Sequence, residues 1–270
     1  DKLVTGVQTC ALPISLSQGA LTVTASVNDK AGNSGQTTHT LTVDTVAPTV
    51  TISTVADDDI VNNAEQLAGQ TIRGTTTAEQ GQTVTVSFNG HSYQATVGAD
   101  GSWSVFVPGR DFLGLSDGDY TITASVNDKA GNPGSANKAI TLDTTPPTVS
   151  FNVVAGDDVI NSVEHAQAQI VSGTSTGANV GDKVVITFGS NQYTTTVDAS
   201  GNWSVGVPAS VISALNDGTV TLSATITDSA GNSSTQTHDV VVNTASVALT
   251  VNTLSGDDVI NAAEAATSLV

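Results

Sequence analysis

A nine-residue motif recurs along the chain at nearly constant intervals. Its copies are ASVNDKAGN at 25–33, ASVNDKAGN at 124–132 and ATITDSAGN at 224–232. Asp29, Asp128 and Asp228 are therefore spaced by about 100 positions, and Trp103 and Trp203 have the same spacing. Self-similarity over the length of one small domain predicts an array of like modules, each with its own core.

The repeat also predicts where the modules begin and end. We expect the end of one module at 16–44, complete modules at 45–143 and 144–243, and the start of a further module at 244–270. Pro48, Pro146 and Pro147 lie at these boundaries, where the fixed φ angle of proline stiffens a short linker. We therefore expect an extended rod, and a chain that is a piece of a longer protein.

Residues 1–15 do not follow the repeat. Val4 stands where the spacing requires a tryptophan, and Thr9 stands where it requires a proline. The stretch GVQTCALPIS also resembles translated sequencing-adapter sequence, so we expect 1–15 to be non-native. Cys10, the single cysteine of the chain, falls in this segment, so no disulfide within the chain is possible. The sequence contains no apolar run long enough to predict a membrane span.

Alternating strand signals fill each module, and no helical period is visible. In the module 45–143 the predicted strands are 49–54, 71–77, 83–88, 92–97, 102–107, 120–126 and 138–142. Asn89-Gly90 separates two of them and is typical of a hairpin turn. Seven such strands predict an all-β fold of tandem immunoglobulin-like β-sandwich modules of about 100 residues. Alternation places Trp103 and Trp203 in the cores, rather than on an exposed sugar-binding platform.

The charge balance narrows the possible partners. The chain has 25 Asp and Glu residues against 7 Lys and Arg residues, for a net charge of -18. Such a surface repels nucleic acid and anionic lipid, since phosphate binding requires a basic surface. Clustered carboxylates can instead gather cations.

The acidic residues cluster in one loop of each module. Counting antiparallel strands places the loop ADDDIVNNAE (56–65) at the C-terminal end of its module and NDKAGN (127–132) at the N-terminal end. Three acidic elements should then meet between the complete modules: Asp57, Asp58, Asp59 and Glu65 of one module, Asp143 of the linker, and Asp228 of the next module. Like charges at this proximity repel one another unless a cation lies between them.

Calcium is the cation that this donor set predicts, because it prefers carboxylate, amide and carbonyl oxygens. The acidic loop recurs as Asp157, Asp158, Asn161 and Glu164, and again as Asp257, Asp258, Asn261 and Glu264. None of these loops has the glycine and glutamate spacing of an EF-hand. The alternative is that the aspartates only close turns by hydrogen bonding to the nearby backbone.

Four motifs together resemble a known family. They are VDTVAPT in the linker, GDDVINSVE in the acidic loop, GADGSW in a turn and the D-x-A-G-N loop. Over 16–270 the chain resembles the bacterial immunoglobulin-like repeats of large, calcium-dependent, type I-secreted surface adhesins of the biofilm-associated kind. The resemblance implies structural extender repeats at the extracellular bacterial cell surface, which act in cell adhesion and biofilm formation.

The resemblance also implies calcium at the joints between neighbouring repeats. It extends this role to Asp44 and Asp143 in the linkers, to the acidic loops, and to Asp128 and Asp228. Asn243 departs from the linker aspartate, which implies weaker binding at that joint. Contacts with other adhesin molecules, or with host or abiotic surfaces, would belong to parts outside this sequence, and no membrane insertion is implied.

Two other functional classes were weighed. A glycan- or receptor-binding module of a secreted protein would require an aromatic or polar patch that is unique to one module. An enzyme would require a recurring catalytic group, but the four histidines, His39, His91, His165 and His238, occupy no equivalent positions. No phosphate-binding loop, zinc pattern or nucleophile elbow is present in the sequence, so we expect no enzymatic activity.

Overall fold

The computed structural model describes residues 16–251 and 259–266. The chain divides into two compact units, Asp1–Thr145 and Pro146–Val270. The first unit contains a two-stranded hairpin, β1 (Gly19–Asn28) with β2 (Ser34–Val43), followed by a complete sandwich. The second unit contains another complete sandwich. Among the described residues, no helix combines the length and the apolar character that a membrane crossing requires.

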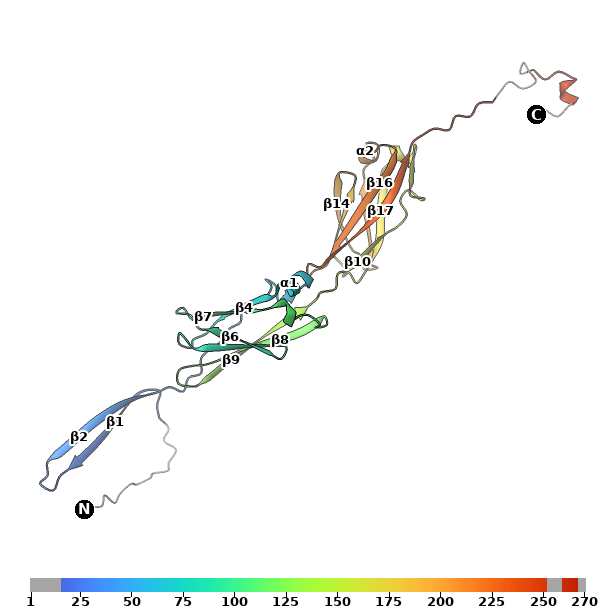
Figure 1. Ribbon diagram of the computed structural model, residues 1–270. Coiled ribbons are helices and arrows are strands. Elements are labelled where there is room, and N and C mark those ends of the chain that lie inside the picture. The colour runs from blue at the N-terminus through green and yellow to red at the C-terminus, as the bar shows by residue number, and fades with distance from the viewer. Residues whose placement is uncertain (1–15, 252–258, 267–270) are drawn as a thin grey trace. The chain divides into compact units, whose positions relative to one another are not determined.

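The sandwich of the first unit consists of two sheets. Its elements are β3 (Ile60–Val61), α1 (Asn63–Ala68), β4 (Gln70–Thr75), β5 (Thr83–Phe88), β6 (His91–Thr96), β7 (Ser102–Val107), η1 (Gly109–Asp111), β8 (Gly118–Asn127) and β9 (Pro133–Leu142). One sheet has the order β3-β9-β8-β5-β6, and the other pairs β4 with β7. Figure 1 shows β4 and β7 on one side of this sandwich and β6, β8 and β9 on the other.

The second unit repeats this plan. Its elements are β10 (Thr148–Phe151), β11 (Val159–Asn161), η2 (Glu164–Ala166), β12 (Gln169–Thr176), β13 (Lys183–Phe188), β14 (Asn191–Thr196), β15 (Asn202–Val207), α2 (Ala209–Ile212), β16 (Gly218–Thr227), β17 (Ser233–Asn243) and η3 (Glu264–Ala266). The sheets have the orders β11-β17-β16-β13-β14 and β10-β12-β15. The all-β, immunoglobulin-like fold expected from the strand pattern is therefore confirmed.

A tryptophan lies in the core of each sandwich. Trp103 is 3% exposed and Trp203 is 2% exposed, so neither ring is a surface platform. A glycine of the paired strand leaves room for each ring and for a backbone carbonyl: a Cβ atom on Gly74 would lie 2.5 Å from Trp103 Cζ2, and closer still to the Thr51 carbonyl oxygen. Gly173 has the same relationship to Trp203. The recurring Gly and Trp positions of the sequence therefore form one packing unit.

The structure differs from the strand prediction in three places. The segment 49–54 makes only an isolated bridge, Val50 to Thr76, although the amide of Thr51 still donates to the Thr75 carbonyl. The acidic loop 56–65 is not entirely irregular, since it contains β3 and the first turn of α1. In addition, β3 runs parallel to β9, a pairing that the antiparallel strand count did not include.

Candidate calcium-binding loops

The D-x-A-G-N loops are closed by their own aspartates. Asp128 Oδ1 accepts the Asn132 backbone amide at 2.8 Å, and Oδ2 accepts Asn132 Nδ2 at 2.8 Å. Asp29 and Asp228 repeat both hydrogen bonds, to Asn33 and to Asn232. Hydrogen bonds from the Asn132 side chain and from the loop amides hold the pKa of Asp128 below its ordinary value. The turn-closing role that was weighed against calcium binding is thus present in all three loops.

The D-x-A-G-N loop of the first sandwich lies at the end where the chain enters. Asn132 Nδ2 donates to the Asp44 backbone carbonyl at 3.2 Å, so the loop contacts the incoming linker. The Asp44 carboxylate accepts from Gln18 Nε2 at 2.9 Å and from the Val46 amide at 3.2 Å. Two of the predicted ligands, Asp44 and Asp128, are therefore brought to the same end of this sandwich.

The acidic loop lies at the opposite end, where the chain leaves the sandwich. In β3, Ile60 and Val61 pair with Thr141 and Leu142, the last residues of β9. The Asp143 amide then donates to the Val61 carbonyl at 3.1 Å. The end assignments made by counting strands are confirmed, and Asp143 lies beside the segment that carries the other predicted ligands of this module, Asp57, Asp58, Asp59 and Glu65.

Two carboxylates of the acidic loop in each sandwich accept hydrogen bonds from the local backbone. Asp58 Oδ1 accepts the Ile60 amide at 2.9 Å, and Asp59 Oδ1 accepts the Val55 amide at 2.9 Å. Asp57 has a left-handed φ of 69°, a region that few residues other than glycine adopt. In the second sandwich, Asp157 Oδ1 accepts the Val159 amide and Asp158 Oδ1 accepts the Val154 amide.

A basic side chain from the last strand joins each acidic loop. Lys138 Nζ lies 2.6 Å from Asp59 Oδ2, and His238 Nε2 lies 2.8 Å from Asp158 Oδ1. Partial burial acts to raise the pKa of Asp59, but the Lys138 hydrogen bond and charge and the Val55 amide outweigh it, so the pKa is lowered. The pKa of Asp158 is lowered in the same way: burial opposes the shift, while a backbone amide and His238 favour it.

Glu65 and Glu164 each form a reciprocal hydrogen-bonded pair with the asparagine three residues earlier. Asn62 accepts the Glu65 amide through its side chain, and Glu65 Oε2 accepts the Asn62 amide at 3.0 Å, which forms a reciprocal capping box before α1. Glu164 makes the same reciprocal pair with Asn161. The spacing Asn-x-x-Glu is a known helix-start signal, so the sequence contained the information for this short helix.

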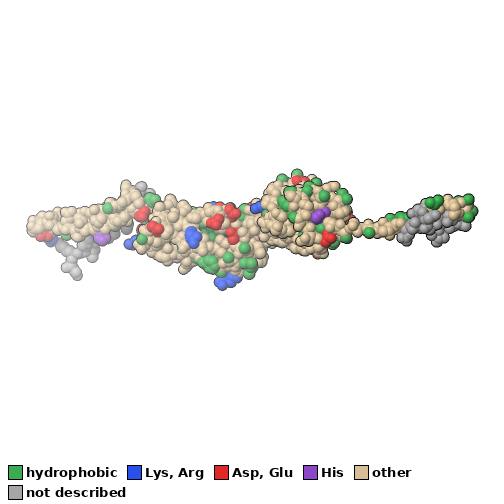
Figure 2. Space-filling view, turned by 90° about the horizontal axis from the view of Figure 1, so that it is seen from above, with side chains coloured by type: hydrophobic (Ala, Val, Ile, Leu, Met, Phe, Trp, Pro, Cys, Tyr) green, Lys and Arg blue, Asp and Glu red, His purple; other side chains and the backbone are tan. Residues whose placement is uncertain are grey.

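The donor types suit calcium, since carboxylate oxygens lie at both ends of the first sandwich. Within residues 16–251 and 259–266, however, no group of three or more His, Cys, Asp or Glu side chains is close enough to hold a metal ion. The calcium assignment of the acidic loops, of Asp143 and of Asp228 therefore stays a prediction. Asp257 and Asp258 lie outside the described residues, as does the segment 1–15. Figure 2 shows acidic side chains in separate small groups on the visible face.

Sequence reasoning missed a second set of polar residues at the linkers. The set comprises Gln18, Asp117 and Asp217, which bind Thr45, Thr144 and Thr244, respectively. Asp117 and Asp217 each precede a glycine at equivalent positions of the repeat, and this recurrence was the available signal. The spacing alone does not reveal which segment the side chains contact.

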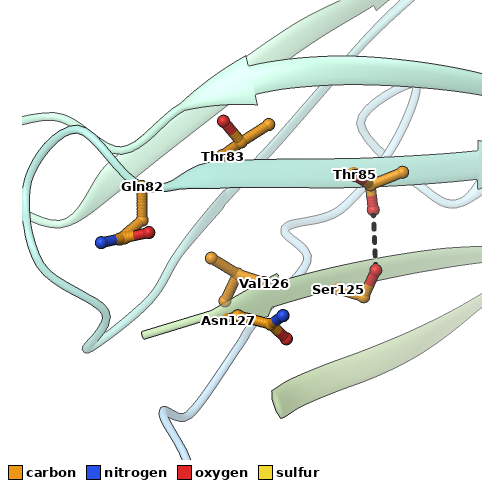
Figure 3. Close-up of a pocket in the computed structure, with 6 residues that line it drawn as sticks. All are labelled: Gln82, Thr83, Thr85, Ser125, Val126 and Asn127. Atoms are coloured by element: carbon orange, nitrogen blue, oxygen red, sulfur yellow. Dashed lines mark hydrogen bonds between the residues drawn. The ribbon is translucent and has the colours of Figure 1, made fainter. Parts of the chain in front are cut away.

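A groove on the sheet of β5 and β8 offers no catalytic chemistry. It has a volume of about 330 Å³ and is lined by Gln82, Thr83, Thr85, Ser125, Val126 and Asn127. None of these six side chains is a carboxylate, an imidazole, an amine or a thiol. Figure 3 shows the one hydrogen bond among them, from Ser125 Oγ to the Thr85 carbonyl at 3.5 Å. A hydroxyl without a neighbouring base is not an activated nucleophile.

The repeats are members of a recognised domain family. A family model described as bacterial Ig-like domain matches residues 47–144 and 161–244, and a second model with the same description matches 3–45. The chain therefore belongs to the bacterial Ig-like domain family. The second match begins inside the segment 1–15, whose non-native origin stays a prediction. No curated protein matches the chain.

Solved structures of adhesins are similar to this chain. One is a Ca²⁺-stabilised adhesin that helps an Antarctic bacterium reach out and bind ice; it is 37% identical, with a TM-score of 0.52 over 93% of this chain and 64% of the other. Another belongs to a 1.5-MDa bacterial ice-binding adhesin and concerns its retention at the host cell surface. It is 33% identical to this chain, with a TM-score of 0.50 over 85% of this chain and 76% of that one. The chain thus spans less than two thirds of the first of these structures.

Proposed function

We propose that this chain is a stretch of the extender region of a bacterial cell-surface adhesin. The observation that carries the proposal is the tandem array of bacterial Ig-like modules, in combination with its similarity to large adhesins. In this role the modules hold an adhesive part of the protein away from the cell, at the extracellular surface, and serve adhesion and biofilm formation. Neighbouring repeats of the same chain are the principal partners.

Calcium is the ion that we propose for the ends of the modules. The Ca²⁺-stabilised adhesin that is similar to this chain supports the proposal. So does the concentration of acidic residues beside Asp143, in the loop whose Asp59 forms an ion pair with Lys138. At millimolar calcium, binding with a dissociation constant near 10⁻⁴ M would stabilise each site by about 1 kcal/mol or more.

The test is thermal unfolding of the whole chain in excess calcium and in chelator. We expect calcium to raise the midpoint, by about 4–8 °C for each kcal/mol of binding free energy. Asp143→Ala and Asp228→Ala should reduce this rise. Asp239→Ala is the matched control, because the Asp239 carboxylate accepts from Thr221 between two strands and lies outside the predicted loops. A midpoint that does not respond to calcium would remove the ion from the proposal.

The extender role also implies that the chain is not an enzyme. Structural contacts support this, since His238 binds Asp158 and His165 Nε2 lies 3.1 Å from the Leu215 carbonyl. Neither histidine contacts a hydroxyl or thiol nucleophile in these interactions. We expect no hydrolytic activity above background with ester, peptide or glycoside substrates.

One observation favours glycan binding as a second candidate function. Phe106 is 54% exposed, next to Gly69, and Leu67 and Leu113 of the same sandwich are 62% and 54% exposed. The repeat-equivalent position of Phe106 is Gly206, so the exposed ring is found in one module. Phe106→Gly should abolish chemical-shift changes in a titration with a neutral oligosaccharide such as cellohexaose. Ile170→Thr, on the equivalent strand pair, is the control.

A further inference from the structure

Each described linker is held at its first threonine by a side chain from the preceding module. Asp117 Oδ1 accepts both the amide and the hydroxyl of Thr144, at 2.9 and 2.8 Å. Asp217 Oδ1 makes the same two bonds to Thr244, at 3.0 and 2.8 Å. The oxygen atom therefore recurs with the repeat, and in both cases it accepts one backbone and one side-chain donor.

At the remaining linker a neutral residue makes the same contacts. Gln18 Oε1 accepts the Thr45 amide at 2.9 Å and the Thr45 hydroxyl at 3.1 Å. Its Nε2 group donates to Asp44 Oδ1 at 2.9 Å. Since Gln18 replaces the aspartate without loss of these bonds, the acceptor geometry rather than the negative charge is the shared property.

The same linker is held from its other side by the following module. Asn132, oriented by both Asp128 oxygens, donates to the Asp44 carbonyl at 3.2 Å. Gly134 approaches the Pro48 carbonyl so closely that no Cβ atom would fit between them. In the second sandwich the equivalent residue is Ser234, whose hydroxyl donates to the Pro147 carbonyl.

We propose that these residues form a linker clamp, which fixes the backbone of the linker 44–48 from both sides without a metal ion and repeats its one-sided contacts at Thr144, Pro147 and Thr244. The clamp comprises Gln18, Asp117 and Asp217 on the preceding side, and Asn132 with Gly134, or Ser234, on the following side. The hydrogen bonds of the clamp do not depend on the proposed extender role. Only the benefit of a stiff linker rests on that role. Proline already restricts φ in these linkers, and the clamp provides partners for several of their backbone donors and acceptors.

The clamp stiffens the linker because it removes backbone conformations that a linker hydrogen-bonded only to water would sample. Between Asp44 and Pro48, the carbonyl of residue 44 and the amides of Thr45 and Val46 all have protein partners. Fixing the backbone of a residue costs conformational entropy, and the clamp offsets this cost with at least two hydrogen bonds to each linker. Calcium at the module ends would add to this effect rather than create it.

Amide hydrogen exchange of the whole chain, followed by NMR in chelator, tests the clamp. We expect the Thr144 amide to be protected without calcium, and Asp117→Ala to accelerate its exchange by about tenfold, as loss of one such hydrogen bond requires. Asp117→Asn keeps the Oδ1 acceptor and should retain most of the protection. Unchanged exchange of the Val86 amide, in the core strand β5, shows that a variant remains folded.

Asp119→Ala is the matched control, because Asp119 lies two residues away and binds the Thr141 hydroxyl of β9 instead of the linker. Equal Thr144 protection in the wild-type chain and in Asp117→Ala would overturn the clamp, as would protection that arises only when calcium is added. The calcium proposal fails separately, if calcium leaves the thermal midpoint unchanged while the Thr144 amide stays protected.

Discussion

Lys138 and Asp59, which are almost eighty residues apart, form an ion pair of 2.6 Å that ties the acidic loop to the last strand of its sandwich. In the other sandwich His238 and Asp158 take the same two positions, at 2.8 Å. The His238 ring also stacks on Phe151, with 5.2 Å between ring centroids. The two sandwiches therefore make the same contact with different basic side chains, an ammonium group in the first and an imidazole in the second.

His238→Phe should destabilise the second sandwich, because the new ring can still stack on Phe151 but offers no nitrogen to Asp158 Oδ1. We expect its free energy of unfolding to fall by about 0.5–1.5 kcal/mol, the usual net contribution of one hydrogen bond. Urea unfolding measures the difference. An unchanged free energy of unfolding would show that the contact with Asp158 does not stabilise the sandwich.

Asp57→Gly should separate backbone strain from ion binding. Asp57 has a φ of 69°, and the equivalent residue of the second sandwich is Gly156 with a φ of 92°. Glycine removes the steric cost of this conformation, so we expect a gain of about 0.5 kcal/mol in chelator, after allowance for its greater unfolded-state entropy. If Asp57 is a calcium ligand, the same variant gains less from added calcium. Denaturant titrations with and without calcium provide both numbers.

Gly74→Ala should destabilise the first sandwich by about 1–3 kcal/mol, because the new methyl group would overlap the Thr51 backbone carbonyl first and the Trp103 ring second. Gly206→Ala is the control. Gly206 also lies within a strand, but a Cβ atom there would meet nothing within 4 Å. Chemical denaturation followed by tryptophan fluorescence measures both variants. Equal effects would show that the Gly74 and Trp103 packing is not what requires glycine.

Asp128→Asn should change how the chain responds to acid. The pKa of Asp128 is lowered from its ordinary value of 3.8, chiefly by the Asn132 side chain. A lowered folded-state pKa means that its stabilisation is complete above the ordinary value and is lost as the pH falls through the lowered one. We therefore expect the variant to be less stable than the wild-type chain at pH 7 and to approach it near pH 2. A constant difference across this range would contradict the expectation.

The strands of the sandwiches could be predicted from the sequence, because apolar and polar residues alternate along each predicted strand and turn residues flank it. The strands 83–88 and 102–107 are observed with the bounds expected. The helix α1 was not predicted, although Asn62 and Glu65 have capping-box spacing, because its 6 residues are too few to show a helical period of apolar side chains. The predicted strand 49–54 makes hydrogen bonds to its neighbour that are too sparse for a regular strand.

The sequence predicts which residues belong to the candidate site, but not which hydrogen bonds those residues make. Spacing along the repeat identified the acidic loops and the linker aspartates, and counting strands placed them at the correct ends of the sandwich. It did not predict that Asp128 uses both carboxylate oxygens within its own loop. It also gave no indication that Asp117 binds the linker, because that contact depends on where two separate turns converge in space.

The sequence by itself determined the repeat, the all-β class and the inward face of each strand, since these properties follow from local periodicity and from the burial of apolar side chains. Only the tertiary structure decided that β3 lies parallel to β9, that Lys138 meets Asp59, and that Asn132 reaches the Asp44 carbonyl 88 residues away. Such contacts join polar groups far apart in the chain. Their partners are selected by the packing of the sheets that bring the loops together, and no local pattern encodes that choice.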